Sequence, residues 1–357
     1  MEKIMFPIFK TKVKGLTKTF NLNNPKERRK YFELKAGEEL KKLRAYFQKG
    51  NTFIAYLLGK KNSGKGTYAK MFAEIIDPER IEHFSIGDMI RGVDEELKDK
   101  KKKKELISFL EKNYRGRFSI EELASLLKKR STSTPLLPTE LILTLVKREI
   151  GQKKKKALFI DGFPRDLDQI NFALFFRDLI GYRDDPDVFV LINVPEKVIG
   201  ERMKHRRVCP FCQTSGNLKL APTSKIGYGL KKKEFYLICD NPRCQGARLQ
   251  PKEGDEKGTE PIKARLMKDE KLIQQTAALY GIPKIFLRNS VPQSLVRTYV
   301  DDYEITPEYY YQWDGKKVQI KERPWIFSDD SGTPSYSLLA ATVVLSLIKQ
   351  MVKALDL

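Results

Sequence analysis

YLLGKKNSGKGTYAKMF, residues Tyr56 to Phe72, is the stretch that decides the fold of this chain. The apolar run Phe53 to Leu58 leads into it and predicts a buried parallel strand. A glycine-rich turn follows, and a helix is expected from about Thr67 to Ile76. A strand, a turn that ends in Gly-Lys and a helix together predict a loop that binds phosphate through its backbone N–H groups.

Two positions differ from the common form of this motif. Gly66 stands where Ser or Thr is usual, and Asn62 replaces a glycine that the loop would be expected to have. Asn tolerates a left-handed backbone better than most residues, so the loop geometry remains accessible. We expect Lys65 to follow the charge of the β- and γ-phosphates and Thr67 to offer its hydroxyl to Mg²⁺, one place later than usual.

The size of the chain indicates a main domain with insertions, or two domains. It has 357 residues, and its 41% hydrophobic content is enough to build a core. Its longest apolar run, Leu338 to Ile348, is too short to span a bilayer and predicts a buried helix. The first residues lack the apolar centre and cleavage site of a signal peptide, so we expect a cytoplasmic protein with no membrane partner.

The net charge of +22 draws attention to anionic partners, either nucleotides or nucleic acid. Much of this charge lies in lysine runs at 100–104, 153–156 and 231–233, and the first fifty residues hold fourteen Lys and Arg against five Asp and Glu. Runs of this kind usually form solvated loops and helix faces. Contact with RNA or a membrane surface is the alternative.

All four cysteines fall in one short region, as Cys209 and Cys212 in CPFC and Cys239 and Cys244 in CDNPRC. Two close pairs in a cytosolic protein predict a four-thiolate zinc site rather than disulfides. Four unrelated thiols would not predict such pairing. The second pair is spaced more widely than the commonest form.

Further strands and helices alternate along the chain. Strands are predicted at 157–162, 188–194 and 284–289, and a helix from Pro25 to Gln48 has Asn24 as its candidate cap. This alternation predicts an α/β fold, a parallel sheet flanked by helices on both faces. The tail combines the aromatic PEYYYQW, a turn at DG and a helix from Tyr336 to Leu355, and we expect its aromatic side chains to pack against the core.

Five motifs occur in order: GKGT at 64–67, HFSIGDMIR at 83–91, FIDGFPRDLDQ at 159–169, ERMKHRRVCPFC at 201–212 and KARLMKDE at 263–270. Together they resemble the nucleoside monophosphate kinases, and adenylate kinase most closely. The resemblance covers about residues 52–282 and leaves both ends unexplained. It implies a P-loop NTPase sheet with a helical insertion that binds the nucleoside monophosphate (NMP) and a small zinc-binding lid.

The resemblance also implies a division of the chain, which we expect to be a monomer. The expected parts are a basic N-terminal extension at 1–50, the first part of the P-loop core at 51–91, the NMP-binding helical insertion at 92–150, the second part of the core at 151–206, the zinc-binding lid at 207–262, the last part of the core at 263–298, and a C-terminal extension with its closing helix at 299–357.

By the same resemblance, a ring of cations surrounds the phosphates. Lys65, Arg91, Arg165, Arg206 and Arg265 would be the catalytic cations, and arginine suits this role because its planar fork binds phosphate oxygens bidentately. The ATP-binding residues would be Gly59, Asn62, Ser63, Gly64, Lys65, Gly66, Thr67 and the adenine-stacking Arg202. AMP would meet Ile86, Arg91, Gly162, Arg165 and Gln169. Thr67, Asp88 and Asp161, the two aspartates placed at strand ends, would be associated with Mg²⁺.

Some residues depart from the family pattern. Lys252, or Arg248 with a shifted alignment, stands in for an arginine of the lid, before the acidic pair Asp255 and Glu256. A lysine does not reproduce a bidentate clamp. Ile86 replaces the usual Thr beside the acceptor base, whereas Gln169 matches the glutamine that reads adenine.

The expected reaction is reversible phosphoryl transfer from MgATP to AMP, giving two ADP. A UMP, CMP or other NMP kinase keeps the same chemistry with another acceptor. An RNA-binding or assembly ATPase on a kinase scaffold is the alternative from another class, favoured by the basic ends, although nucleic acid is not a predicted partner.

Overall fold

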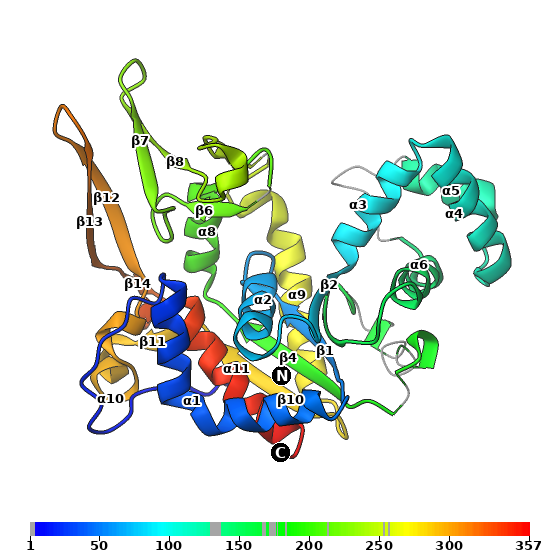
Figure 1. The fold of residues 1–357 in the computed structure, drawn as a ribbon, viewed down its shortest axis with the longest axis horizontal. Helices are drawn as coiled ribbons and strands as arrows, with labels where there is room; N and C mark the ends of the chain where they lie inside the picture. Colours follow the sequence, from blue (N-terminus) through cyan, green and yellow to red (C-terminus); the bar gives the residue numbers. More distant parts are fainter. Residues whose placement is uncertain are drawn as a thin grey trace.

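A five-stranded parallel sheet lies at the centre of the computed structural model (Figure 1). The structure describes residues 4–357 except 129–136, 166–168, 171–175, 177, 183, 213, 253, 256 and 257. The strand order is β10-β4-β1-β3-β2. These strands are β1 (Ile54–Gly59), β2 (Ile81–Ser85), β3 (Ala157–Asp161), β4 (Asp187–Asn193) and β10 (Lys284–Arg288).

The central strand β1 carries buried side chains on both faces. Ala55 and Leu57 join one apolar cluster, while Tyr56 and Leu58 join the other, as the two-residue period of a strand requires. The four strands predicted from the sequence are confirmed. β2, which begins before the HFSIGDMIR motif, was not predicted.

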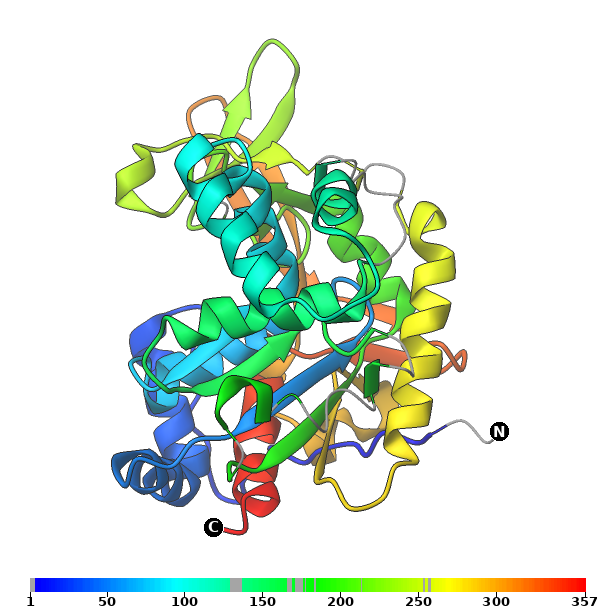
Figure 2. The same ribbon diagram turned by 90° about the vertical axis from the view of Figure 1, so that its right-hand side faces the viewer.

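Helices cover both faces of the sheet (Figure 2). One cluster includes residues of α1 (Pro25–Gln48), α2 (Lys65–Ile76), α8 (Glu196–His205) and α11 (Ala340–Ala354). The other includes residues of α6 (Thr139–Gly151) and α9 (Lys263–Ala277). The predicted helix 25–48 is confirmed with its cap, because the Asn24 side chain accepts from the N–H groups of Lys26 and Glu27.

Two insertions leave the sheet in different directions. The first is helical: α3 (Ile86–Glu96), α4 (Lys100–Asn113), α5 (Ile120–Lys128) and α6. The second, the lid, begins after α8 and consists of β5 (Arg206–Val208), β6 (Ser215–Asn217), β7 (Lys225–Gly229), β8 (Glu234–Ile238), the 3₁₀ turn η1 (Pro242–Cys244), β9 (Gln250–Pro251) and η2 (Glu260–Ile262). The lysine runs at 100–104 and 231–233 lie on the mostly exposed start of α4 and in the exposed β7–β8 turn.

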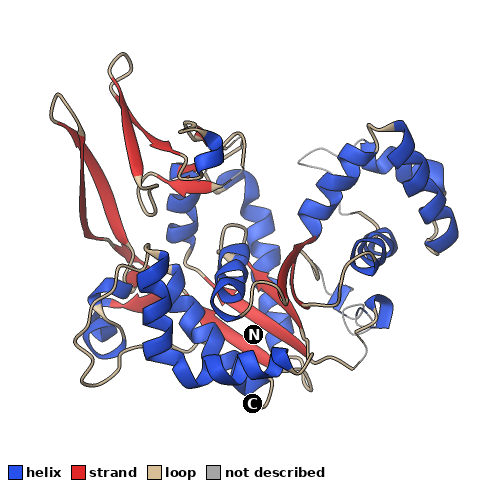
Figure 3. Cartoon of the chain, in the orientation of Figure 1, coloured by secondary structure: helices blue, strands red, loops and turns tan. Residues whose placement is uncertain are grey.

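The chain between β10 and α11 forms a further segment, which we call the insert (residues 289–339). It contains β11 (Ser290–Pro292), η3 (Gln293–Leu295), α10 (Val296–Tyr299), η4 (Asp302–Glu304), β12 (Pro307–Trp313), β13 (Val318–Pro324), β14 (Ile326–Ser328) and β15 (Pro334–Ser337). β11, β15 and β14 form one small antiparallel sheet, and β12 and β13 form a hairpin that stands out from the molecule (Figure 3).

Two sequence expectations for the tail need correction. The closing helix does not start at Tyr336, because Pro334–Ser337 pairs with β11 and β14 as a strand and the helix begins at Ala340. The aromatic residues Tyr311 and Trp313 pack against the lid rather than against the core. The predicted turn at Asp314-Gly315 is confirmed, with Gly315 at φ +95°.

No helix among the described residues is long and apolar enough to cross a membrane.

A buried ion-pair cluster joins the first fifty residues to the insert. Lys35 Nζ lies 2.7 Å from Asp301 Oδ2 and 2.8 Å from Glu304 Oε1, and the side chains of Lys35 and Glu304 are both fully buried. Glu304 also accepts 2.6 Å bonds from the hydroxyls of Thr11 and Tyr31. Burial and the neighbouring Glu304 raise the pKa of Tyr31 well above its ordinary value. The two chain ends therefore depend on one polar cluster.

We expect Lys35→Ala to destabilise the protein by about 3–5 kcal/mol, because it leaves the Glu304 carboxylate buried without its cation. Urea unfolding measures this loss. Lys41→Ala is the matched control on the same helix, since Lys41 pairs with Glu38 on the exposed surface and little change is expected. If Lys35→Ala lowered the free energy of unfolding no more than the control does, this cluster would not contribute to stability as we expect.

Candidate active site

The loop between β1 and α2 has the backbone of an anion-binding turn. Asn62 has φ +66°, and Gly64 has φ +98° where it caps the N-terminus of α2. Helix α2 begins directly after this turn. Its first N–H groups have no carbonyl partner within the helix, so they are available to an anion. The prediction that Asn62 tolerates a left-handed backbone is confirmed.

Gly66 in the first turn of α2 lies close to a side chain of β2. A Cβ atom at residue 66 would lie 3.1 Å from Cε1 of His83, which comes from β2. A side chain at residue 66 would therefore force this ring to shift by a few tenths of an ångström. Thr67 is exposed in the first turn of α2.

Lys65 stands between the loop and the end of β3. Its Nζ donates to the carbonyl oxygens of Gly59 at 2.8 Å and Lys60 at 3.3 Å, and it lies 3.8 Å from Asp161 Oδ1. Burial alone would raise the pKa of Asp161, but interaction with His83 and the charges of Lys65 and Arg165 outweigh it and lower that pKa. Asp161 is therefore an ionised carboxylate beside the loop, at a strand end as predicted.

Asn62 connects the loop to Arg202 of α8 and to Arg206 at the start of the lid. Its side-chain Oδ1 accepts from Arg206 Nη1 at 2.7 Å, and its carbonyl oxygen accepts from Arg202 Nη1 at 3.2 Å. The Asn62 Nδ2 group is buried and finds no partner among the described residues. Arg206 also makes a bidentate pair with Asp255, with nitrogen to oxygen distances of 2.6 and 2.9 Å. The lid is thus joined to the loop by side chains.

Other cations lie close enough to interact electrostatically across the site. Partial burial, with Arg206 and Arg91 nearby, lowers the pKa of Lys252 against the opposing effect of Asp255. Burial and Arg265 likewise lower the pKa of Lys61. Cations of the loop, α3, the lid and α9 thus lie within electrostatic range of one another, and we call the region between them the positive space.

The two candidates for the lid cation differ in position. Lys252 lies in this positive space, whereas Arg248 pairs with Glu234 at 2.6 Å and its guanidinium stacks on Tyr236 in the β7–β8 hairpin. Of the predicted acidic pair, Asp255 is buried against Arg206, and Glu256 lies outside the described residues.

The predicted acceptor residues gather at the end of β3. Arg165 Nε donates to the Gly162 carbonyl at 2.9 Å, and Ile86 Cβ would lie 3.6 Å from a Cβ on Gly162. Gln169 is buried, with Oε1 accepting from the Arg165 N–H at 2.8 Å and Nε2 donating to Thr139 Oγ1 at 3.2 Å. Its amide in this structure orients Arg165 and α6.

Arg91 and Asp88 lie farther out on α3, where they form an exposed ion pair with each other. The expectation that Asp88 sits at a strand end is wrong. It lies in the first turn of α3, where its N–H donates to Ser85 Oγ at 3.2 Å, because Ser85 already caps that helix.

The four cysteine thiols of the lid converge. Their Sγ atoms all lie within 4.8 Å of one another, and those of Cys212 and Cys239 are 3.6 Å apart. Four thiolate sulfurs, each about 2.3 Å from one zinc ion, would be separated from one another by distances similar to these Sγ–Sγ distances. Cys209, Cys239 and Cys244 are buried, so this donor set fits a closed structural site.

Sequence reasoning missed three polar residues that shape the site. Lys60 is held by Glu196 at 3.3 Å, Glu270 at 3.1 Å and Asp330 at 3.8 Å. Asp269 Oδ2 accepts from the Lys61 N–H at 3.2 Å, and it belongs to the KARLMKDE motif that was noted. The fully buried Asn289 accepts from Arg202 at 3.3 Å, and nothing in the sequence pointed to it.

A parallel sheet with this loop at the end of its central strand makes the chain a P-loop NTPase α/β protein. A family model described as "AAA domain" matches residues 58–209. Adenylate kinase of Clostridium novyi is 30% identical over 226 residues, which are 63% of this chain and 85% of that protein. Adenylate kinase of Clostridium acetobutylicum is 31% identical over 59% of this chain and 78% of its own length. The chain belongs to the adenylate kinase family.

The match with another relative is shorter. Adenylate kinase of Thermotoga petrophila is 33% identical over 172 residues, which are 47% of this chain and 66% of that protein. The family resemblance inferred from the five motifs is confirmed by these relatives.

Asp269 and Asp161 should respond oppositely to pH. Burial raises the pKa of Asp269 in spite of Lys65 and Arg265. The unfolded chain therefore loses this proton more readily than the folded protein does, and the free energy of unfolding falls as pH rises above the unfolded-state pKa of about 4. Asp269→Asn should therefore stabilise the protein at pH 7 and have no effect below about pH 4. Each unit of pKa shift corresponds to about 1.4 kcal/mol.

Asp161→Asn is the matched control, and we expect it to destabilise the protein at pH 7, opposite to Asp269→Asn. The lowered pKa of Asp161 gives stability that is present above about pH 4 and lost as pH falls through the folded-state value. Chemical unfolding of both variants between pH 3 and 7 measures these effects. The same sign for both variants at pH 7 would refute this assignment.

Proposed function

We propose that this chain is a nucleoside monophosphate kinase that transfers a phosphoryl group from MgATP to AMP, giving two ADP. One observation carries the proposal: cations from the loop, the helical insertion, the lid and α9 lie within electrostatic range of one another, beside the loop that carries Lys65. Phosphoryl transfer needs this kind of positioning and charge neutralisation more than it needs a covalent nucleophile.

The donor phosphates would lie on the loop. The N–H groups at the start of α2 and Lys65 would hold their oxygens, and Arg202 would lie beside the base. Mg²⁺ bound with ATP neutralises phosphate charge, and the Thr67 hydroxyl and the Asp161 carboxylate are the oxygen groups available to hold it. Arg206 is already fixed by Asp255 and Asn62, so it would meet the transferring group without reordering.

The acceptor would lie between β3 and the helical insertion. Arg165 is held by Gly162 through its side chain and by Gln169 through its backbone N–H, and Arg91 lies on α3 of the helical insertion. Both would bind the phosphate of the monophosphate. AMP is favoured over UMP and CMP by Gln169, although Ile86 fills the place of a residue that would contact the base.

The lid would exclude water from the reaction, with a structural zinc ion held by its four thiolates. The module has a small apolar cluster of its own, which consists largely of these cysteines with Leu237 and Leu249. A metal would therefore supply stability that this core lacks.

Product analysis with ATP and a panel of monophosphates tests the proposal. We expect ADP from AMP at a higher kcat/KM than the diphosphates from UMP, CMP or dTMP. Lys65→Ala should lower kcat by at least about a hundredfold, because it removes a charge aimed at the transferring group. Lys60→Ala is the matched control: Lys60 pairs with carboxylates, so its loss should act mainly on stability.

Three results would count against this function. These are ATP hydrolysis that no monophosphate redirects, a better rate with a pyrimidine acceptor, and unfolding of the Lys65→Ala variant.

Metal removal should act on the lid first. We expect about one zinc ion per chain, and chelation should raise hydrogen exchange in the lid while the central sheet keeps its protection. Cys239→Ser should release the metal and give the same pattern. A chain purified without metal, or a lid unaffected by chelation, would remove the zinc site.

A further inference from the structure

The hairpin β12–β13 of the insert, which we call the strap (residues 307–324), lies beside the β7–β8 hairpin of the lid. Both stand at the end of the molecule opposite to helices α3, α4 and α5 (Figure 1). The strap follows the five motifs in the sequence and lies outside the family resemblance, so nothing in the proposed reaction accounts for it.

At its root, the strap is bonded to the turn that follows β6. The N–H of Tyr309 donates to the Lys219 carbonyl at 2.7 Å, and the Tyr311 hydroxyl donates to the Leu218 carbonyl. Lys219 Nζ lies 3.4 Å from Glu308 and 2.8 Å from Glu201 on α8. It also lies 5.2 Å from the centroid of the buried Trp325 ring. One lysine of the lid thus reaches α8 and the strap together.

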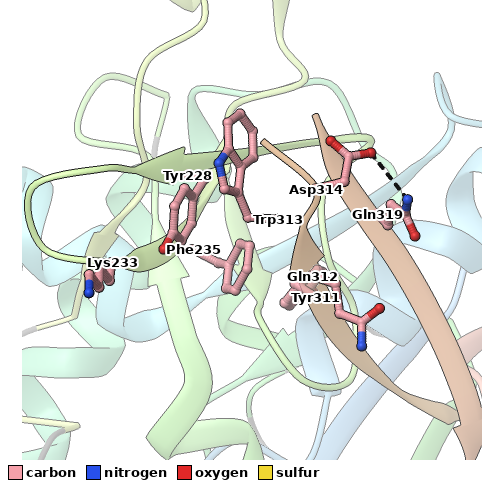
Figure 4. A pocket seen from close by; sticks show the side chains of 8 residues that line it. All are labelled: Tyr228, Lys233, Phe235, Tyr311, Gln312, Trp313, Asp314 and Gln319. Atoms are coloured by element: carbon pink, nitrogen blue, oxygen red, sulfur yellow. Dashed lines mark hydrogen bonds between the residues drawn. The ribbon is translucent and has the colours of Figure 1, made fainter. Parts of the chain in front are cut away.

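Farther out, the contact is aromatic. Trp313 stacks on Tyr228 with centroids 5.1 Å apart and an interplanar angle of 18°, and Tyr311 lies 5.5 Å from Phe235. Figure 4 shows the rings of Tyr228 and Phe235 from one hairpin beside that of Trp313 from the other. Such pairs stabilise a contact beyond the effect of the area that they bury.

The base of the insert is fixed to the sheet and to the phosphate loop. Asp330 accepts from the N–H of Glu196, at the start of α8, at 2.8 Å and lies 3.8 Å from Lys60 Nζ. Asp329 pairs with Arg288 of β10 at 3.4 Å. The insert is therefore attached to the core at one end and to the lid at the other.

We propose that the strap sets the position of the lid over the phosphate loop, with Lys219, Tyr311 and Trp313 as positioning residues. The inference rests on the proposed function. A lid joined to the core only where the chain enters and leaves it can turn about those two points. A third attachment on its outer side restricts that turn and keeps Arg206 and Asp255 near Asn62 before nucleotide binds. ATP then binds without the cost of ordering the lid.

The test compares Tyr311→Ala/Trp313→Ala with the unaltered chain by two readouts. Spin labels on noncanonical residues at Lys225 in the lid and Lys70 on α2, both exposed, report the lid-to-core distance and leave the four cysteines untouched. We expect the double variant to broaden this distance distribution. We also expect KM for ATP to rise at least about threefold while kcat changes less than about twofold, because saturating ATP reorders the lid.

Matched variants separate positioning from general damage. Tyr310 lies on the same strand, and it is 42% exposed and contacts Arg323 within the strap. Tyr310→Ala removes this aromatic side chain, and neither readout should change. Trp313→Phe should keep the native distribution and KM. If the double variant does not fold, Trp313→Ala alone replaces it.

An unchanged distance distribution in a folded variant that lacks the aromatic contact would overturn the proposal. A rise in KM shared by Tyr310→Ala would do the same. Failure of the proposed kinase activity is a separate result, because the distance measurement needs no catalysis and still decides whether the strap holds the lid.

Discussion

The concentration of positive charge in front of the phosphate loop is the constraint on which the rest of the structure depends. Lys61, Lys65, Arg206, Lys252 and Arg265 would repel one another in the absence of compensation. Two carboxylates limit this repulsion from fixed places: Asp161 at the end of β3 and Asp255 in the lid. Asp255 is buried, whereas the Asp161 side chain keeps 24% of its surface exposed.

The same constraint explains why two neighbouring lysines of the loop differ in their surroundings. Burial alone would lower the pKa of Lys60, but Glu270, Asp330 and Glu196 outweigh it and raise that pKa. The pKa of Lys61 is lowered because burial and other cations act in the same direction. Lys60 therefore joins elements together, and Lys61 adds to the field of the site. Their positions in the sequence give no sign of this difference.

The segments outside the family resemblance are part of the folded unit. α1 packs in the same apolar cluster as α2 and α11, and the buried pair of Lys35 and Glu304 joins α1 to the insert. The insert continues to the lid through Lys219 and the aromatic contact. A path of packed and bonded residues thus runs from the first helix, through the insert, to the lid.

The sequence by itself determined the local elements and the family. The strand, turn and helix at 53–76 follow from a short apolar run, Gly-Lys and helical spacing, because these signals act between neighbouring residues. The helix 25–48 and the cysteine pairs are local signals as well. The start of the closing helix was predicted wrongly because Pro334–Ser337 becomes a strand only when β11 and β14 lie beside it.

Only the tertiary structure decided which charges pair and which remain in the site. Three such contacts join Asn289 to Arg202, His83 to Gly66, and Trp313 to Tyr228. The two residues of each pair are far apart in the sequence, and the periodicity of the sequence gives no information on such pairs. Asn62 shows both levels at once. Its left-handed backbone was predictable from its residue type, whereas its bond to Arg206 exists because the fold brings the start of the lid to the end of β1.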